Sequence, residues 1–396
     1  MLTGGEDYEL ARRFTALHYQ IAISREPARC RDGGRSLGEA CDVLTEMAKD
    51  PDVLIVGTFS GAMTVAKMGM VLIRMIEAGM LHAVVSTGAL MAHGLSEAVG
   101  LTHYKANPRV SDELLFEKGY NRVYDTLEME ANLNTIDEFV RGELDKLDPT
   151  APWSSEIICR HLGKALAEMG DSPGILRSAY LHNVPVYVPA FTDSEMGLDV
   201  ATWMLRKIHK EHGNAPDFDV WKHATPPAYN PFLDLLSYAR LVGTKKKLGI
   251  FTIGGGVPRN WAQQVAPFYD IVQHRLGVEM DHPRFQYGVR ICPEPVHWGG
   301  LSGCTYSEGV SWGKFIPQSE GGRFAEVYAR QVGSVYAGLR PLAAQRWPGA
   351  LCQPFVFGAG EVDWSGADAL RSLVVGLLDG GWDVESTVEL ARRAQA

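Results

Sequence analysis

The chain lacks several signals that would place it in a specialised class of protein. Its six cysteines are scattered without a Cys-x-x-Cys pair, which argues against a disulfide framework and a zinc-binding spacing. A formal net charge of −9 leaves no basic excess for binding nucleic acid. The first seven residues carry neither a basic region nor an apolar run, so we expect no signal peptide. These absences together favour a cytoplasmic protein that does not bind nucleic acid.

Long uncharged apolar runs are also missing. The most apolar stretch, residues 63–80, contains Lys67, Arg74 and Glu77, which is too much charge for a membrane span. We therefore expect a buried helix there and no membrane association. No Gly-x-Gly-x-x-Gly motif follows an early strand, so the usual fingerprint of a Rossmann dehydrogenase is absent as well.

Apolar runs rich in β-branched residues do alternate with helical periods. They predict strands at 53–57, 83–87, 184–188 and 249–253, and helices at 62–80 and 88–99. Residues 102–134 are typical of a long connection with short elements, and residues 212–230 of a loop. This alternation predicts an α/β fold with a doubly wound, mostly parallel sheet. Ligands of such sheets lie at the carboxyl ends of the strands.

Small and hydroxyl residues follow each predicted strand. Three glycines at 254–256 would let the backbone approach a ligand, and amides at the start of the following helix would favour an anion such as a pyrophosphate. Helix capping would explain any one of these turns. Four such turns, at 57–64, 86–89, 192–193 and 254–256, predict a shared ligand crevice.

A second candidate site is the segment 307–314, which ends in Ser-Trp-Gly-Lys. Lys314 can act as an amine nucleophile if loss of water lowers its pKa. Trp312 can offer a cation–π face to an alkylammonium group, and Glu308 can pair with its charge. Judged by its composition alone, the segment would be a surface loop.

This segment resembles the catalytic segment of the deoxyhypusine synthase family. The resemblance extends to Phe-Thr-Ile-Gly-Gly-Gly at 251–256, Pro-Ala-Phe-Thr-Asp at 189–193 and Gly-Tyr-Asn-Arg at 119–122. It covers residues 35–345, flanked by helical extensions at 1–34 and 346–396. Residues 299–303, together with Pro258 and Asn260, are more similar to the bacterial branch, which is associated with homospermidine synthesis.

The resemblance implies a Rossmann-like fold and NAD-dependent transfer of an aminoalkyl group between small amines. Lys314 would be the covalent nucleophile, and Glu308 and Trp312 would line the amine channel. Seven residues of the predicted crevice would hold NAD: Ser60, Thr64, Thr87, Gly88, Asp193, Gly255 and Gly256. The resemblance also implies a homotetramer with shared active sites.

Some departures from the family concern the substrate. Leu301 and Leu198 stand where the eukaryotic enzymes have aspartates that bind the cationic ends of spermidine, and Asn260 replaces a histidine. A leucine cannot pair with an ammonium group. Candidate substitute carboxylates are Glu294, Glu195 and Asp199, which is next to Leu198. We therefore take Asn260, Asp199 and Leu301 as the candidate substrate-binding positions.

Other departures concern the cofactor. His93-Gly94 stands where His-Asp or Glu-Glu-Asp is usual, Arg259 replaces a lysine, Cys292-Pro293-Glu294 replaces a Thr-rich turn, and Arg330 replaces an aspartate. Three alternatives remain open: deoxyhypusine synthesis on a protein lysine, the same chemistry on a specialised amine, and a silent protein that binds NAD or an amine. His103 and His297 have no second ligand at metal-binding spacing, so we expect no metal.

Overall fold

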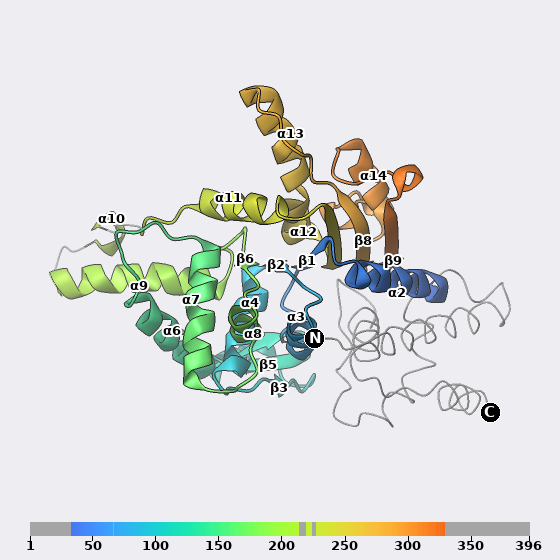
Figure 1. Cartoon of the computed structure of the whole chain (residues 1–396). Helices are drawn as coiled ribbons and strands as arrows, with labels where there is room; N and C mark the ends of the chain where they lie inside the picture. Colours follow the sequence, from blue (N-terminus) through green and yellow to red (C-terminus); the bar gives the residue numbers. More distant parts are fainter. Residues whose placement is uncertain (1–32, 66, 214–218, 224–226, 329–396) are drawn as a thin grey trace, which may run out of the picture. The chain divides into compact units, whose positions relative to one another are not determined.

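The computed structural model describes residues 33–65, 67–213, 219–223 and 227–328 (Figure 1). The predicted extension at 346–396, Arg330 and most of the extension at 1–34 lie outside these ranges. The described residues form two compact units. The first comprises residues 33–60, 67–84 and 239–328, and the second comprises residues 61–65 and 85–238 apart from the gaps.

A six-stranded sheet confirms the predicted α/β class. Its strand order is β6-β2-β1-β7-β8-β9, and β1 with β7, β7 with β8, and β8 with β9 pair in parallel. The strands are β1 (Val53–Phe59), β2 (Ala83–Ser86), β6 (Val186–Tyr187), β7 (Lys247–Ile253), β8 (Phe285–Cys292) and β9 (Arg323–Tyr328). β1 is buried along its whole length, as a central parallel strand should be.

Helices of the first unit pack on these strands. α2 lies across β8 and β9 (Figure 1). Its Met47 fits against Gly249 of β7, where an added Cβ would lie 2.3 Å from the methionine sulfur. The helices are α2 (Gly33–Lys49), α3 (Gly69–Glu77), α12 (Gly256–Gln263), α13 (Val265–Leu276) and α14 (Tyr306–Ser311), with short 3₁₀ turns η1 (Val296–Trp298), η2 (Leu301–Gly303) and η3 (Gln318–Glu320).

The second unit is mainly helical. A small antiparallel sheet of order β3-β5-β4 accompanies the helices. Gly163 allows α7 and α8 to approach closely, since an added Cβ would lie 2.3 Å from the Leu176 carbonyl oxygen. The elements are α4 (Gly88–Ala98), β3 (Tyr104–Lys105), α5 (Asp112–Glu117), β4 (Tyr120–Val123), β5 (Thr126–Met129), α6 (Glu130–Leu144), α7 (Ser155–Met169), α8 (Ile175–Leu181), α9 (Glu195–His212) and α10 (Val220–His223). α11 (Pro231–Val242) crosses the boundary between the units.

Two predicted elements differ from the structure. The helix expected at 62–80 begins only at Gly69, because Gly61 and Lys67 adopt positive φ angles of 74° and 64° that interrupt a right-handed helix. The loop expected at 212–230 contains the short helix α10. Among the described residues, no helix is long and apolar enough to cross a membrane.

Candidate active site

The backbone of Lys314 is fixed from two sides. Its N–H donates to the Gly309 carbonyl of α14 at 3.0 Å, and its own carbonyl accepts from the N–H of Phe285 in β8 at 2.9 Å. Between α14 and the lysine, Gly313 turns the chain with a φ of 68°, a conformation that favours glycine. Lys314 therefore has a defined place beside the first residue of β8.

The side chain of Lys314 meets Asn260 on α12. Its Nζ donates to the Asn260 Oδ1 at 3.3 Å, and the side chain is half-buried. Burial lowers the pKa of Lys314, and the positive charge of Arg259 lowers it further. Both effects favour the neutral amine, which is the nucleophilic form of a lysine. The structure thus brings together Lys314 and Asn260, two predicted site residues 54 positions apart.

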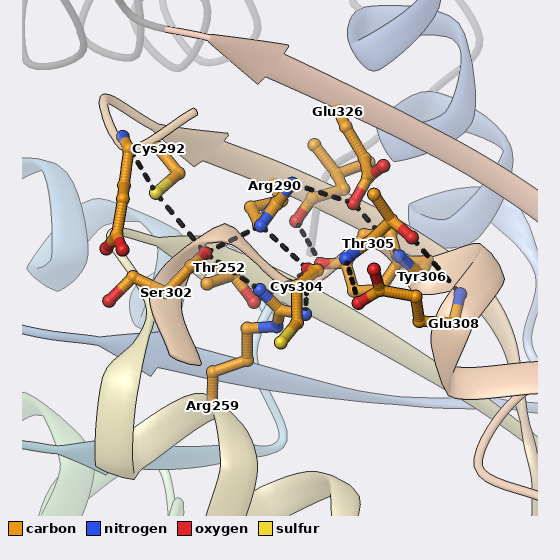
Figure 2. A network of polar contacts seen from close by, with 12 residues as sticks. Thr252, Arg259, Arg290, Cys292, Ser302, Cys304, Thr305, Tyr306, Glu308 and Glu326 are labelled. Atoms are coloured by element: carbon orange, nitrogen blue, oxygen red, sulfur yellow. Dashed lines mark hydrogen bonds and ion pairs between the residues drawn. The ribbon is translucent and has the colours of Figure 1, made fainter. Parts of the chain in front are cut away.

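Arg259, the neighbour of Asn260, binds the loop that precedes α14. Its guanidinium donates to the carbonyl of Ser302 at 3.1 Å and to the carbonyl of Cys304. Figure 2 shows a second guanidinium, that of Arg290 on β8, donating to the same two carbonyls at 2.6 and 2.8 Å. Two fixed cations thus hold one short loop segment. A lysine at 259 could not make this forked contact.

The network continues into the sheet. Arg290 pairs with Glu326 of β9 at 3.0 Å, and the same carboxylate accepts from the N–H of Tyr306 (Figure 2). The Tyr306 hydroxyl donates to the Val289 carbonyl at 3.0 Å and lies 3.3 Å from Thr252 Oγ1. Because these groups are buried and bonded to strands, α14 and its approach are anchored to the core.

Glu308 has a structural partner. Its Oε2 accepts from the N–H of Thr305 at 3.1 Å, while the Thr305 hydroxyl accepts from the N–H of Glu308 at 3.1 Å. This pair forms a capping box at the start of α14. Trp312 ends the helix with 72% of its surface exposed, and Leu301 is 47% exposed. Their predicted contacts with an amine stay predictions.

The candidate cofactor residues of the first unit form one turn. Ser60 Oγ accepts from the N–H of Gly255 at 3.1 Å. Gly254 and Gly256 have φ angles of 81° and 62°, which favour glycine. An added Cβ at Gly255 would lie 2.6 Å from the Ser302 Cα, so the glycine turn packs against the loop held by Arg259.

The candidate cofactor residues of the second unit surround the start of α4. The Thr87 hydroxyl donates to the Gly61 carbonyl at 2.6 Å, which leaves the first amides of α4 without a side-chain cap. Thr64 donates to a carbonyl of α4 at 2.9 Å. Gly88 lies against Ser194, 2.3 Å from an added Cβ, and Asp193 is exposed. Uncapped amides beside small residues fit the pyrophosphate of a dinucleotide.

The side chain of Asp199 faces the interior, whereas that of its neighbour Leu198 faces solvent. Leu198 is 57% exposed on α9, whereas Asp199 is 3% exposed and its Oδ2 makes no hydrogen bond within the described part of the chain. Burial, together with the negative charges of Glu195 and Asp137, raises the pKa of Asp199 to about 7. Asp199 is therefore an inward-facing carboxyl group of the second unit.

The chain is similar over most of its length to one family. A sequence model of deoxyhypusine synthase matches residues 30–331. "Probable deoxyhypusine synthase 2" of Methanosarcina acetivorans is 33% identical over 72% of this chain and 76% of its own length. A "Deoxyhypusine synthase-like protein" of Chlorobaculum parvum is 32% identical over 78% of this chain and 83% of its own length.

The chain therefore belongs to the deoxyhypusine synthase family. The class that this membership defines is the NAD-dependent aminobutyl transferases. The matched range includes both Lys314 and the glycine turn at 254–256.

Arg290 is a residue of this site that sequence reasoning missed. A charged side chain in the apolar run Tyr-Gly-Val-Arg-Ile-Cys was the available signal, because a buried arginine needs several acceptors. Cys292, which stands out in the sequence as a departure from the family, lies at the same loop. Its Sγ is 3.5 Å from the Ser302 carbonyl oxygen.

Proposed function

We propose that this chain is an aminoalkyl transferase that acts on small amines through an imine on Lys314, in the manner of a homospermidine synthase. The observation that carries the proposal is the half-buried Lys314 ammonium group, hydrogen-bonded to Asn260 and next to the Arg259 charge. An amine in this setting loses its proton more readily than an exposed lysine, and a neutral amine can attack carbon.

NAD would supply the hydride acceptor and donor that makes the carbon next to a substrate nitrogen electrophilic. Ser60, Gly255 and Gly256 of the first unit, and Thr64, Thr87, Gly88 and Asp193 of the second, are the residues proposed to hold it. Their hydroxyls, small side chains and uncapped amides support this assignment.

Lys314 would form a new C–N bond with the oxidised carbon while the donor's amine leaves with a proton. An acceptor amine would then attack the same carbon and release Lys314. Asn260 Oδ1 accepts a hydrogen from Nζ and so aims the lysine lone pair. Burial lowers the pKa of this amine, and the charge of Arg259 lowers it further.

Leu301 and Leu198 favour a small amine over spermidine bound as in the eukaryotic enzymes, because neither side chain can pair with an ammonium group. Asp199 is a candidate partner for such a group, since it is an inward-facing carboxyl with one oxygen that makes no hydrogen bond within the described residues. A homotetramer with shared active sites and a cytoplasmic location belong to the same proposal.

A borohydride trap tests the proposal. The full chain is incubated with NAD and a panel of amines that includes putrescine, spermidine and agmatine. It is then reduced with borohydride, and its intact mass is measured by mass spectrometry. We expect an adduct on the wild-type protein and on Lys246→Ala, an exposed lysine of the same unit, and none on Lys314→Ala. The added mass identifies the donated group.

Two failures have different meanings. NAD binding without an adduct from any amine would refute the small-amine substrates and favour a specialised amine or a protein lysine. Absence of both NAD binding and adduct would favour a silent binding protein. Titration calorimetry with NAD distinguishes these two outcomes.

A further inference from the structure

Three polar side chains from distant parts of the sequence meet inside the second unit. His93 comes from α4, His103 from the segment before β3, and Glu128 from β5 (Figure 1 shows these elements). Their candidate ligand atoms all lie within 4.8 Å of one another. The His103 and Glu128 side chains are 0% and 2% exposed, whereas His93 is 21% exposed. Spacing along the sequence could not reveal this group.

The carboxylate at the centre has polar neighbours that favour its charged form despite burial. Burial raises the pKa of Glu128, but the imidazole of His103 at 3.4 Å and hydrogen bonds with His93 and Ser96 outweigh it and hold the pKa well below its usual range. A buried negative charge requires a compensating cation or several donors. Two imidazoles and one carboxylate are also a donor set that divalent transition metals prefer.

The distances can be compared with those of a metal site. Ligand atoms about 2.0–2.1 Å from a tetrahedral ion lie about 3.3 Å from one another. His103 Nε2 and Glu128 Oε1 are 3.4 Å apart, which matches. His93 Nδ1 and Glu128 Oε2 are 2.6 Å apart, a hydrogen-bond distance that must open by about 0.7 Å for metal ligands. His93 is the most exposed of the three, so its ring has the most freedom to rotate.

Groups around the cluster are those expected of outer-sphere partners. The Ser96 hydroxyl donates to Glu128 Oε1, and Glu97 Oε1 lies 3.8 Å from His103 Nδ1. A metal-bound histidine usually directs its second nitrogen to such an acceptor. Three protein ligands would leave a fourth position for water or another small molecule.

We propose that His93, His103 and Glu128 form a binding site for one divalent transition-metal ion of the zinc class. None of these residues belongs to the Lys314 site, so this proposal does not depend on the proposed function. The competing arrangement is the same three side chains joined by hydrogen bonds alone.

The test uses the full chain, stripped with a chelator and desalted. We titrate it with Zn²⁺ by calorimetry and with Co²⁺ by visible absorption. We expect one ion per chain, with an affinity at least about 100-fold weaker in His93→Ala and about 10-fold weaker in Ser96→Ala. His161→Ala is the matched control, because His161 lies 3.3 Å from Glu143 as a single His–Glu pair, and its affinity should equal that of the wild type.

His103→Ala and Glu128→Gln alter fully buried groups and could unfold the unit. X-ray absorption of the zinc-loaded wild type therefore provides evidence that needs no variant. Two imidazoles and oxygen ligands support the site, and a sulfur ligand overturns it. An undiminished affinity in His93→Ala, or no binding by the stripped wild type, also overturns the proposal and leaves the hydrogen-bonded arrangement.

Discussion

Asp199 makes the stability of the second unit depend on pH. Its pKa of about 7 in the folded chain lies well above its ordinary value of 3.8. Between these values the folded state binds more protons than the unfolded state, so stability is greatest at low pH and falls as pH rises towards 7. At 1.36 kcal/mol for each unit of pKa difference, the cost of the ionised carboxylate above pH 7 reaches an upper limit of about 4 kcal/mol.

The substitution Asp199→Asn should remove this dependence, because an amide stays neutral at every pH. Any fixed packing effect of the amide is the same at pH 5 and pH 8, so the difference between the two pH values isolates the charge. We expect the free energy of unfolding of the variant, relative to that of the wild type, to be about 2.5 kcal/mol higher at pH 8 than at pH 5.

Urea unfolding followed by tryptophan fluorescence provides the measurement, since Trp153 and Trp203 of the same unit are buried. Glu138→Gln removes an exposed carboxylate from α6 and should change the free energy of unfolding by the same amount at pH 5 and pH 8. Parallel pH curves for wild type and Asp199→Asn would refute the reasoning, because they would show that Asp199 is ionised at no cost. An amine that binds Asp199 should stabilise the wild type more at pH 8 than at pH 6, and this excess should vanish in Asp199→Asn.

Three further substitutions test the Lys314 region. Gly255→Ala places a Cβ 2.6 Å from Ser302 Cα and should weaken NAD binding at least about 10-fold by calorimetry, whereas Gly142→Ala, in open space on α6, should not; equal affinities would contradict the role of the turn. Thr305→Ala removes the cap of α14 and should cost about 1 kcal/mol, seen as faster hydrogen exchange confined to that helix; unchanged exchange would argue against the cap. Arg290→Met leaves the Glu326 carboxylate without its cation and removes one of the two guanidinium donors from the Ser302 and Cys304 carbonyls, so it should lower the free energy of unfolding by about 3 kcal/mol in urea; an unchanged value would show that the network is energetically neutral.

The sheet could be predicted where hydrophobicity alone specifies a strand. Residues 53–57 and 249–253 are continuous apolar runs after turn signals, and both form central parallel strands. The helix at 62–80 was predicted too long, because apolar content does not reveal the positive φ of Lys67. β8 was missed, since Arg290 and Gly288 interrupt its apolar pattern.

Site residues could be predicted from the sequence only where they lie in a motif that resembles the family. The family resemblance named Lys314 and Asn260 separately as candidate site residues, and the structure joins them by a hydrogen bond. His93, His103 and Glu128 meet through the packing of α4 and β5, which no local spacing encodes. The inward direction of Asp199 depends on which face of α9 is buried.

The capping box formed by Thr305 and Glu308 gives this glutamate a structural role that does not depend on catalysis. A glutamate that closes the first turn of α14 would be retained for folding even in a chain that had lost its chemistry. Its survival in a sequence is therefore no sign of activity. Glutamine at 308 can still close the box but carries no charge, whereas alanine loses both properties. The contrast between these two substitutions separates a residue kept for the helix from one kept for a cationic substrate.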